Sequence, residues 1–465
     1  MHSFKLSKYF IIFIVSLFFC VPAFYNGSAL LFPDSIGYIQ GGFENTPIEQ
    51  RVWTYAAFVR HLSLAETLWP VVLLQALITV FSIYLVYKYL FQVKKELYFI
   101  LCSVSVAVTT AAAFHCSRVM PDFFTPLLIL HAALLLWGKP MSRRDYWLCV
   151  LLLLLSLSTH NSHIVIAVLL LLAMGIGGLW KPVRQFYQTA GLDWKRVRTV
   201  VSTVIASLLL TSTLHWSVGG GFKPTEGGGI FLFARLCDFN IPQDYLKEYC
   251  GSQPDSEVYQ KLCANPDFSL GGYFLWISLP SSIYEQGGWT EENKRIYGSA
   301  AKDMLTTPKY FFRYVSRTAE TTLMQFFYID YDPLREVEGK YTGHPVKNYY
   351  PHYKVDILRS RQEMANYNRV DTGFKNSLQQ VVFFLSLFIL LVAFLTLDLS
   401  ASTKVAIVFI LMGLLVNAFV MAATSGVYDR YQSRVAWLIT LPAFWLLCHW
   451  TEQFFRRISS SSQNL

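Results

Sequence analysis

The chain has 465 residues, of which 54% are hydrophobic and only 15% are charged. About a quarter of the residues in a soluble domain are charged, so this composition excludes an ordinary soluble protein and indicates a membrane protein. The net charge of +9 gathers mainly in short loops between apolar runs, where topology and anionic lipid headgroups account for it. No nucleic-acid partner is implied, and membrane lipids are the expected surroundings.

Apolar runs of the length needed to cross a hydrocarbon core of about 30 Å predict about ten transmembrane helices. The first run has a basic start, but no small-x-small cleavage site follows it, so we interpret it as an uncleaved span. The predicted fold class is an all-α polytopic membrane protein. The spans lie near residues 9–25, 68–91, 97–116, 122–137, 146–160, 163–180, 198–215, 378–398, 405–424 and 434–450.

Lysine and arginine residues occupy every second loop, which is the bias of cytoplasmic loops. Both termini are therefore predicted to be cytoplasmic, and the chain divides into three parts. Residues 1–215 form a seven-span module, 216–377 form a mainly helical outer-face segment, and 378–465 form a three-span module with a cytoplasmic tail. The exposed outer material lies mostly in 216–377 and in the first outer loop, 26–67, so we expect function on the outer face.

The first outer loop carries a lone carboxylate, Asp34, in the stretch LLFPDSIGYIQGG directly after the first span. Further along this loop, apolar residues recur at spacings of three or four, which predicts an amphipathic helix lying against lipid or other spans. These residues are Val52, Tyr55, Ala56, Val59 and Leu62.

The large outer segment opens with two glycine triplets around Lys223 and Glu226. This pattern fits neither a P-loop nor a dinucleotide fingerprint, so it predicts a flexible connection. Thr290 and the pair Thr307-Pro308 are typical helix starts, and they predict two helices. Residues 330–376 are polar and show no clear period, so we expect irregular structure there.

Three cysteines of this segment, Cys237, Cys250 and Cys263, are evenly spaced. The spacing fits no zinc pattern, which requires close pairs and histidines. Three cysteines allow at most one internal disulfide with one thiol left over, and a structural bridge is the preferred interpretation.

Ionisable residues gather at the outer ends of the spans. Such residues at membrane depth usually face a cavity or one another, which suggests a functional site. The alternative is that each simply marks a helix end at the headgroup level. The residues are Asp34, Arg118 and Asp122 in HCSRVMPDFF, His160 and His163 in STHNSH, and Asp429, Arg430 and Arg434 in YDRYQSR.

Three of these features occur in an order that resembles the C-type (GT-C) integral-membrane glycosyltransferases. They are Asp34 followed by an amphipathic helix, the pair Pro121-Asp122 before the fourth span, and the pair Arg430-Tyr431 at the mouth of the last span. This superfamily includes protein O-mannosyltransferases, the aminoarabinose transferase that acts on lipid A, and bacterial O-antigen glucosyltransferases. The resemblance covers the topology of the first seven spans and these short motifs, and no part of 216–377.

The resemblance implies transfer of a sugar from a polyprenyl-phosphate donor to a glycolipid, polysaccharide or protein acceptor, at the outer face of a bacterial inner membrane. The first motif is Asp34-Ser35, whereas several relatives carry an Asp-Glu pair. The sequence shows no acidic pair suited to a metal, which argues against a metal-dependent mechanism. We therefore expect no cofactor beyond the lipid-linked donor.

The residue types fit this chemistry. Asp34 is the candidate base for an acceptor hydroxyl, and a single base with direct attack implies inversion at the anomeric carbon. Arginine suits phosphate oxygens, so the candidates for donor phosphate binding are Arg430, Arg434 and Arg118. Asp122, the second catalytic candidate, either orients the acceptor or holds one of these arginines in a salt bridge, and the sequence leaves both open.

The remaining candidates would contact the substrate. Sugar hydroxyls or phosphate are possible ligands of histidine, although a histidine satisfied at a helix end is the commoner case. Aromatic side chains of the outer segment, Trp276, Tyr284 and Trp289, could stack on sugar faces, but an interfacial aromatic belt explains such residues too. The predicted substrate-binding residues are Tyr38, His160, His163 and Tyr431.

Three other functions remain as alternatives. An O-antigen ligase or polymerase relies on arginine and histidine in outer loops and needs no early aspartate, so Asp34 argues against it. A transporter or flippase for lipid-linked glycans usually has repeated halves and charges near the middle of its spans. A non-catalytic scaffold that presents 216–377 to a partner predicts that Asp34 and Asp122 are dispensable.

Overall fold

The computed structural model describes residues 7–48, 50–93, 95–250, 257–264, 268, 271–276, 282–331, 346, 348–364 and 373–461. Within these residues every regular element is a helix, and the extended backbone includes one isolated parallel bridge between Leu30 and Arg118. The all-α prediction is therefore confirmed for the described part of the chain.

Five helices are long and apolar enough to cross a membrane, and each coincides with a predicted span. This finding supports a helical membrane protein. The helices are α5 (Trp69–Leu85) with its π-helical end η1 (Val86–Leu90), α10 (Asn161–Leu179), α12 (Trp194–Ser217), α22 (Gly373–Thr396) and α23 (Ala401–Thr424).

The other five predicted spans coincide with helices that are shorter or interrupted, so the count of ten crossings stays a prediction. These helices are α1 (Lys8–Phe19) with α2 (Val21–Asn26), α6 (Glu96–Thr109) with α7 (Ala112–Ser117), η2 (Pro121–Phe123) with α8 (Phe124–Trp137), α9 (Arg143–Ser158), and α24 (Asp429–Ala436) with η4 (Trp437–Ile439) and α25 (Thr440–Ser461).

Helix α8 occupies the centre of the helical bundle, and all of its residues are buried. It packs against α5, α9, α12 and α23. Its 14 residues are fewer than the roughly 20 that a lipid-facing span needs. Because protein rather than lipid surrounds α8, its length need not match the hydrocarbon thickness.

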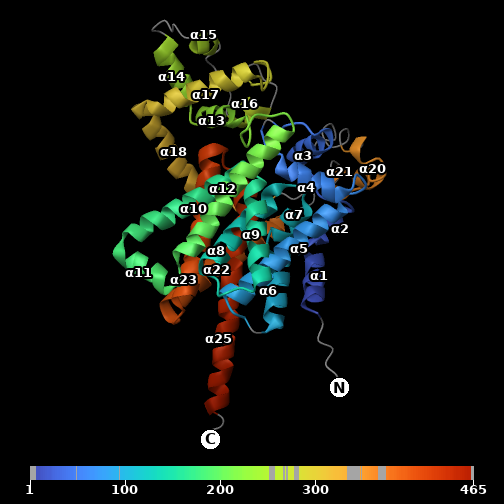
Figure 1. The fold of residues 1–465 in the computed structure, drawn as a ribbon, viewed down its shortest axis with the longest axis vertical. Coiled ribbons are helices and arrows are strands. Elements are labelled where there is room, and N and C mark those ends of the chain that lie inside the picture. The colour runs from blue at the N-terminus through green and yellow to red at the C-terminus, as the bar shows by residue number, and fades with distance from the viewer. Residues whose placement is uncertain are drawn as a thin grey trace.

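The outer segment forms a unit with its own hydrophobic core around Phe233, Phe274 and Tyr297. As Figure 1 shows, this unit lies at the end of the molecule opposite to the start of α1 and the end of α25. The two chain ends thus point to one side, although their cytoplasmic location stays a prediction. The unit's helices are α13 (Gly228–Cys237), α14 (Ile241–Tyr249), α15 (Glu257–Ala264), α16 (Gly271–Trp276) and α17 (Glu291–Thr306).

The structure confirms the predicted helix starts and the disulfide of the outer segment, but not the capping role of Thr307. The Thr290 side chain accepts a hydrogen bond from the Asn293 N–H and caps α17. Helix α18 (Pro308–Phe327) begins after Thr307 as predicted, but the Thr307 hydroxyl donates back to the Asp303 carbonyl instead of capping α18. Cys250 and Cys263 form the predicted single disulfide, which leaves the thiol of Cys237 free and buried.

The first outer loop folds into α3 (Pro33–Glu44) and α4 (Thr54–Ser63). The predicted amphipathic helix is α4, and its buried face carries Tyr55 and Val59. This face packs against α3 and α5, so protein rather than lipid covers it.

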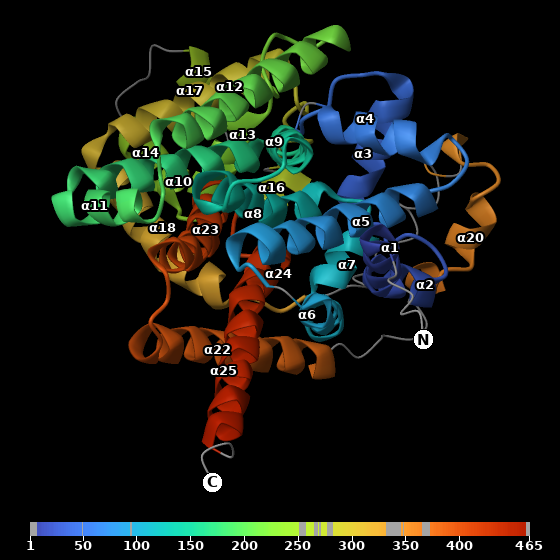
Figure 2. The ribbon, with the colours of Figure 1, turned by 60° about the horizontal axis from the view of Figure 1, so that its bottom comes forward.

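Two short helices, α20 (Lys354–Leu358) and α21 (Arg361–Met364), lie alongside α2, α3 and α4 (Figures 1 and 2). The prediction of irregular structure over 330–376 is therefore wrong for these residues. The reason is tertiary packing, because Tyr350 and Tyr353 are buried against the first outer loop. Residues 332–345 and 365–372 lie outside the described residues.

Helices α3 and α4 approach so closely at Gly42 that a Cβ there would lie 2.6 Å from the carbonyl oxygen of Ala56. We expect Gly42→Ala to lower the free energy of unfolding by about 1–3 kcal/mol, because the backbone must move to make room. The measurement is the melting temperature of the purified protein in detergent. The control is Gly175→Ala on α10, where a Cβ meets nothing within 4 Å. Equal melting temperatures for the two variants would contradict the close crossing.

Candidate active site

Asp34 lies in the first turn of α3, which begins at Pro33. Both residue types are favourable at this position. The N–H groups of the first turn have no partner within the helix, so the missing N–H of proline costs nothing there. The same N–H groups attract the negative charge of the carboxylate. The Ser35 hydroxyl accepts a hydrogen bond from the Phe32 N–H (2.9 Å) and donates one to the Val119 carbonyl (2.7 Å). The start of α3 is thereby tied to the segment that precedes η2.

Two arginines hold the Asp34 carboxylate. Its Oδ1 lies 2.7 Å from Nη2 of Arg51, and its Oδ2 lies 3.2 Å from Nη1 of Arg430. Burial disfavours the charged form of Asp34, but the positive charges of Arg51 and Arg430 outweigh it and hold the pKa of the carboxyl below its usual value. Asp34 is therefore ionised at neutral pH. Its contact with Arg430 joins two of the ionisable residues that were predicted to gather at the outer ends of the spans.

Arg51 is a site residue that sequence reasoning missed. Its guanidinium lies 5.6 Å from the centre of the Tyr38 ring and 5.9 Å from that of Trp276. Gly37 leaves room for it, since a Cβ there would lie 3.2 Å from Nη1 of Arg51. The feature of the sequence that could have indicated Arg51 is a basic residue in the same outer loop as the lone carboxylate.

Arg430 and Arg118 both approach the ring of Phe32, at 4.4 and 5.4 Å from its centre. Together with Arg51, they place three guanidinium groups around Phe32 and Asp34. A second carboxylate, that of Asp429, lies beside Arg430 in the chain. This concentration of arginine near one carboxylate suits an anionic ligand. Two of the three predicted phosphate-binding arginines, Arg118 and Arg430, thus lie together.

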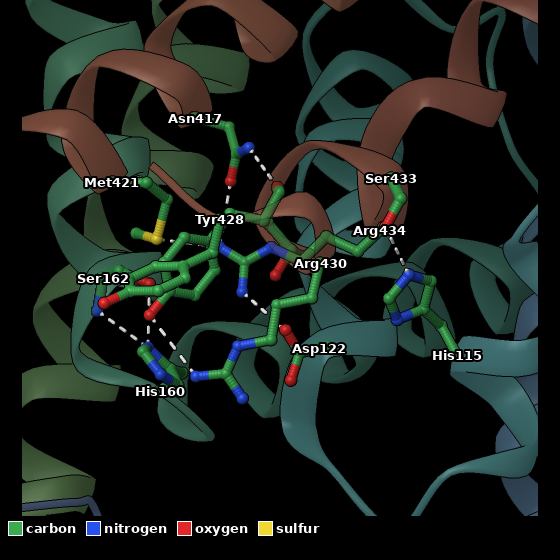
Figure 3. A network of polar contacts seen from close by, with 12 residues as sticks. His115, Asp122, His160, Ser162, Asn417, Met421, Tyr428, Arg430, Ser433 and Arg434 are labelled. Carbon is green, nitrogen blue, oxygen red and sulfur yellow. Dashed lines mark hydrogen bonds and ion pairs between the residues drawn. The ribbon is translucent and has the colours of Figure 1, made fainter. Parts of the chain in front are cut away.

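Asp122 and Arg434 form an ion pair (Figure 3) that is more deeply buried than the two ion pairs of Asp34. Oδ1 of Asp122 lies 2.9 Å from Nη1 of Arg434, and the two side chains are only 6% and 1% exposed. Nη2 of Arg434 donates to Oδ1 of Asn417 at 3.0 Å and contacts the sulfur of Met421. Of the two roles left open for Asp122, this geometry favours the salt bridge, and it favours a structural role for Arg434 over phosphate binding.

The histidines differ in how far protein groups satisfy them. His163 is buried, with Nε2 at 2.7 Å from the Thr125 hydroxyl and Nδ1 at 2.6 Å from the Ser156 carbonyl, so it acts as a structural residue. His160 is partly exposed and contacts Ser162 through Nδ1 (Figure 3). Of the two predicted substrate-binding histidines, the geometry therefore favours His160.

Tyr431 lies beside Arg430, and Tyr38 lies beside Arg51. The Tyr431 hydroxyl accepts from Nη2 of Arg430 at 3.3 Å and forms a hydrogen bond with the Ser425 hydroxyl at 2.7 Å. Tyr38 is buried under Arg51, and burial raises the pKa of its hydroxyl above the usual value. Both predicted tyrosines thus orient arginine side chains.

Buried glutamine side chains fasten the non-helical backbone of the site. Gln362 accepts from the Leu31 N–H (2.9 Å) and donates to the Leu31 carbonyl (2.6 Å), just before α3. Gln325 on α18 exchanges the same two bonds with Tyr428, just before α24 (2.8 and 2.9 Å). Gln75 on α5 donates to the carbonyl of Arg118 at 2.9 Å. The segments that carry or directly precede Asp34, Arg118 and Arg430 are therefore each held by a glutamine amide.

The chain matches no protein-family model, and comparisons with curated proteins and with solved structures find no match. Among the residues that the structure describes, no group of three or more His, Cys, Asp and Glu side chains is placed to hold a metal ion. The family resemblance therefore rests on the predicted topology and the order of the short motifs, and metal independence stays a prediction.

The buried pair gives a testable expectation. Asp122→Asn leaves the charge of Arg434 buried without its counterion, and we expect a loss of about 3–5 kcal/mol in the free energy of unfolding. The melting temperature in detergent measures it. The control is Glu320→Gln, which breaks the exposed Arg317–Glu320 pair on α18 and should change the melting temperature little. A similar, small effect of both substitutions would contradict a buried ion pair.

Proposed function

We propose that the protein is an inverting glycosyltransferase that moves a sugar from a polyprenyl-phosphate donor to an acceptor at the outer face of a bacterial inner membrane. The observation that carries the proposal is the Asp34 carboxylate held between Arg51 and Arg430, at 2.7 and 3.2 Å. A base next to phosphate-binding cations is the combination that this reaction needs.

The reaction assigns a task to each group. Asp34 removes the proton of an acceptor hydroxyl, whose oxygen attacks the anomeric carbon of the donor sugar. The bond from that carbon to the donor phosphate oxygen breaks, and the phosphate leaves with the electron pair. Arg430, Arg118 and Arg51 stabilise the negative charge on the departing phosphate.

The ion pairs of Asp34 suggest how the donor activates the base. A carboxylate between two arginines is a weak base, because they lower its pKa. A donor phosphate that takes one of these arginines as its own partner withdraws positive charge from Asp34. Burial then dominates and raises the pKa of Asp34, so the base gains strength when the donor is bound.

Asp34→Asn tests the proposal directly, because the amide keeps the size of the side chain but accepts no proton. We expect loss of sugar transfer by at least a hundredfold, at unchanged membrane abundance. Mass spectrometry of glycolipids and surface polysaccharide compares cells that carry the wild type, the variant or no protein. The control is Asp356→Asn, an exposed carboxylate on α20.

A glycan mass that disappears in both the variant and the deletion supports sugar transfer and identifies the sugar class. Wild-type glycans in Asp34→Asn, with a change only in the deletion, would reject Asp34 as the base. That result would favour the transporter or scaffold function instead.

Removal of Arg51 tests the electrostatic part of the mechanism. Asp34 works as a base only when ionised, and Arg51 is the largest influence that lowers its pKa. In Arg51→Gln the pKa of Asp34 therefore rises, and the acidic limb of the transfer rate moves to higher pH. The rate of sugar transfer in membrane vesicles is measured against pH, with the exposed Arg359→Gln as control. An acidic limb at the wild-type pH would contradict this role of Arg51.

A further inference from the structure

Trp276 presents a half-exposed indole ring beside the candidate active site. It ends α16 and is 45% exposed. Its ring centre lies 5.9 Å from that of Phe231 and 6.3 Å from that of Trp289, and these two rings are 5.5 Å apart. The three rings form one aromatic group, of which Trp276 is the most exposed member.

Glycines fix α16 at this place. The Gly271 N–H donates to Oδ1 of Asp238 at 2.8 Å, and a Cβ on Gly271 would lie 2.4 Å from the Ala234 carbonyl oxygen. A Cβ on Gly272 would lie 3.0 Å from the hydroxyl of Tyr428, the residue that precedes α24. Helix α16 is thus packed between α13 and the segment that delivers Arg430.

One guanidinium links this aromatic group to the candidate base. Arg51 lies 5.9 Å from the centre of the Trp276 ring and 2.7 Å from Asp34. A molecule seated on the Trp276 face therefore lies next to charged groups that bond hydroxyls. An interfacial aromatic belt contacts lipid headgroups and requires no such neighbour.

A half-exposed indole ring beside an arginine and a carboxylate suits a sugar ring. The C–H bonds of one pyranose face carry slight positive charge and pack on the electron-rich face of the indole. The sugar hydroxyls point outward from the ring edge and bond to the guanidinium and the carboxylate. A proline ring also packs its C–H bonds on an indole, but it carries no hydroxyl groups for the guanidinium and the carboxylate, and a lipid tail carries none either.

We infer that Trp276 is the platform on which the acceptor binds, and that the acceptor is a carbohydrate, as part of a glycolipid or a polysaccharide, rather than a protein. The statement that the bound carbohydrate is the acceptor rests on the proposed function. The binding of a pyranose ring by Trp276 stands on the geometry alone.

The test is binding of the purified protein, in lipid nanodiscs, to an array of immobilised bacterial polysaccharides and hexose oligosaccharides. We expect the wild type to bind at least one glycan. Trp276→Ala should weaken that binding at least tenfold, and Trp276→Tyr should restore most of it, because the aromatic face is kept. The control is Trp216→Ala, which removes a tryptophan on α12 that is 63% exposed.

Equal binding by the wild type and Trp276→Ala, or no binding of the wild type to any glycan, would overturn the inference. The binding assay contains no donor, so it tests the platform separately from the sugar transfer that Asp34→Asn tests. Normal sugar transfer by Asp34→Asn together with loss of glycan binding in Trp276→Ala would reject the base and keep the platform.

Discussion

Asp34 forms one ion pair within its own loop, with Arg51, and a second one with Arg430, which is 396 residues away in the chain. Arg51 and Asp34 come from the first outer loop, and Arg430 comes from the start of α24. For the charges to meet, the backbone must leave the helical path at both places. The helices next to these places are short, namely α2, α3 and α24.

Buried non-helical backbone is stable only when its polar groups are hydrogen-bonded. Gln362, Gln325 and Gln75 meet this need at the segments before α3, α24 and η2. Two of them lie on parts of the outer segment, on α18 and α21. The outer segment therefore helps to hold the charged residues in place, besides offering the Trp276 face. We expect a rigid site rather than one that assembles when substrate binds.

The sequence allowed Asp34 and Arg430 to be predicted on one face, because alternating spans bring their outer ends together. Arg51 was not predicted as a site residue, because the ion-pair partners within a loop depend on how that loop folds. The phosphate-binding role of Arg434 stays a prediction. A sequence shows charge but not depth, and Arg434 is almost fully buried against Asp122. Helices α20 and α21 have no apolar period of their own. Contacts of Tyr350 and Tyr353 with the first outer loop stabilise them, and such contacts are invisible in a sequence.

The central claim is that a donor phosphate shares the arginines that hold Asp34. Electron cryomicroscopy of the protein with undecaprenyl phosphate tests it most directly. The account predicts phosphate density within hydrogen-bond distance of Arg430 or Arg51, with at least one of the two ion pairs of Asp34 broken. Phosphate density elsewhere, with the ion pairs of Asp34 to Arg51 and Arg430 intact, would contradict the account.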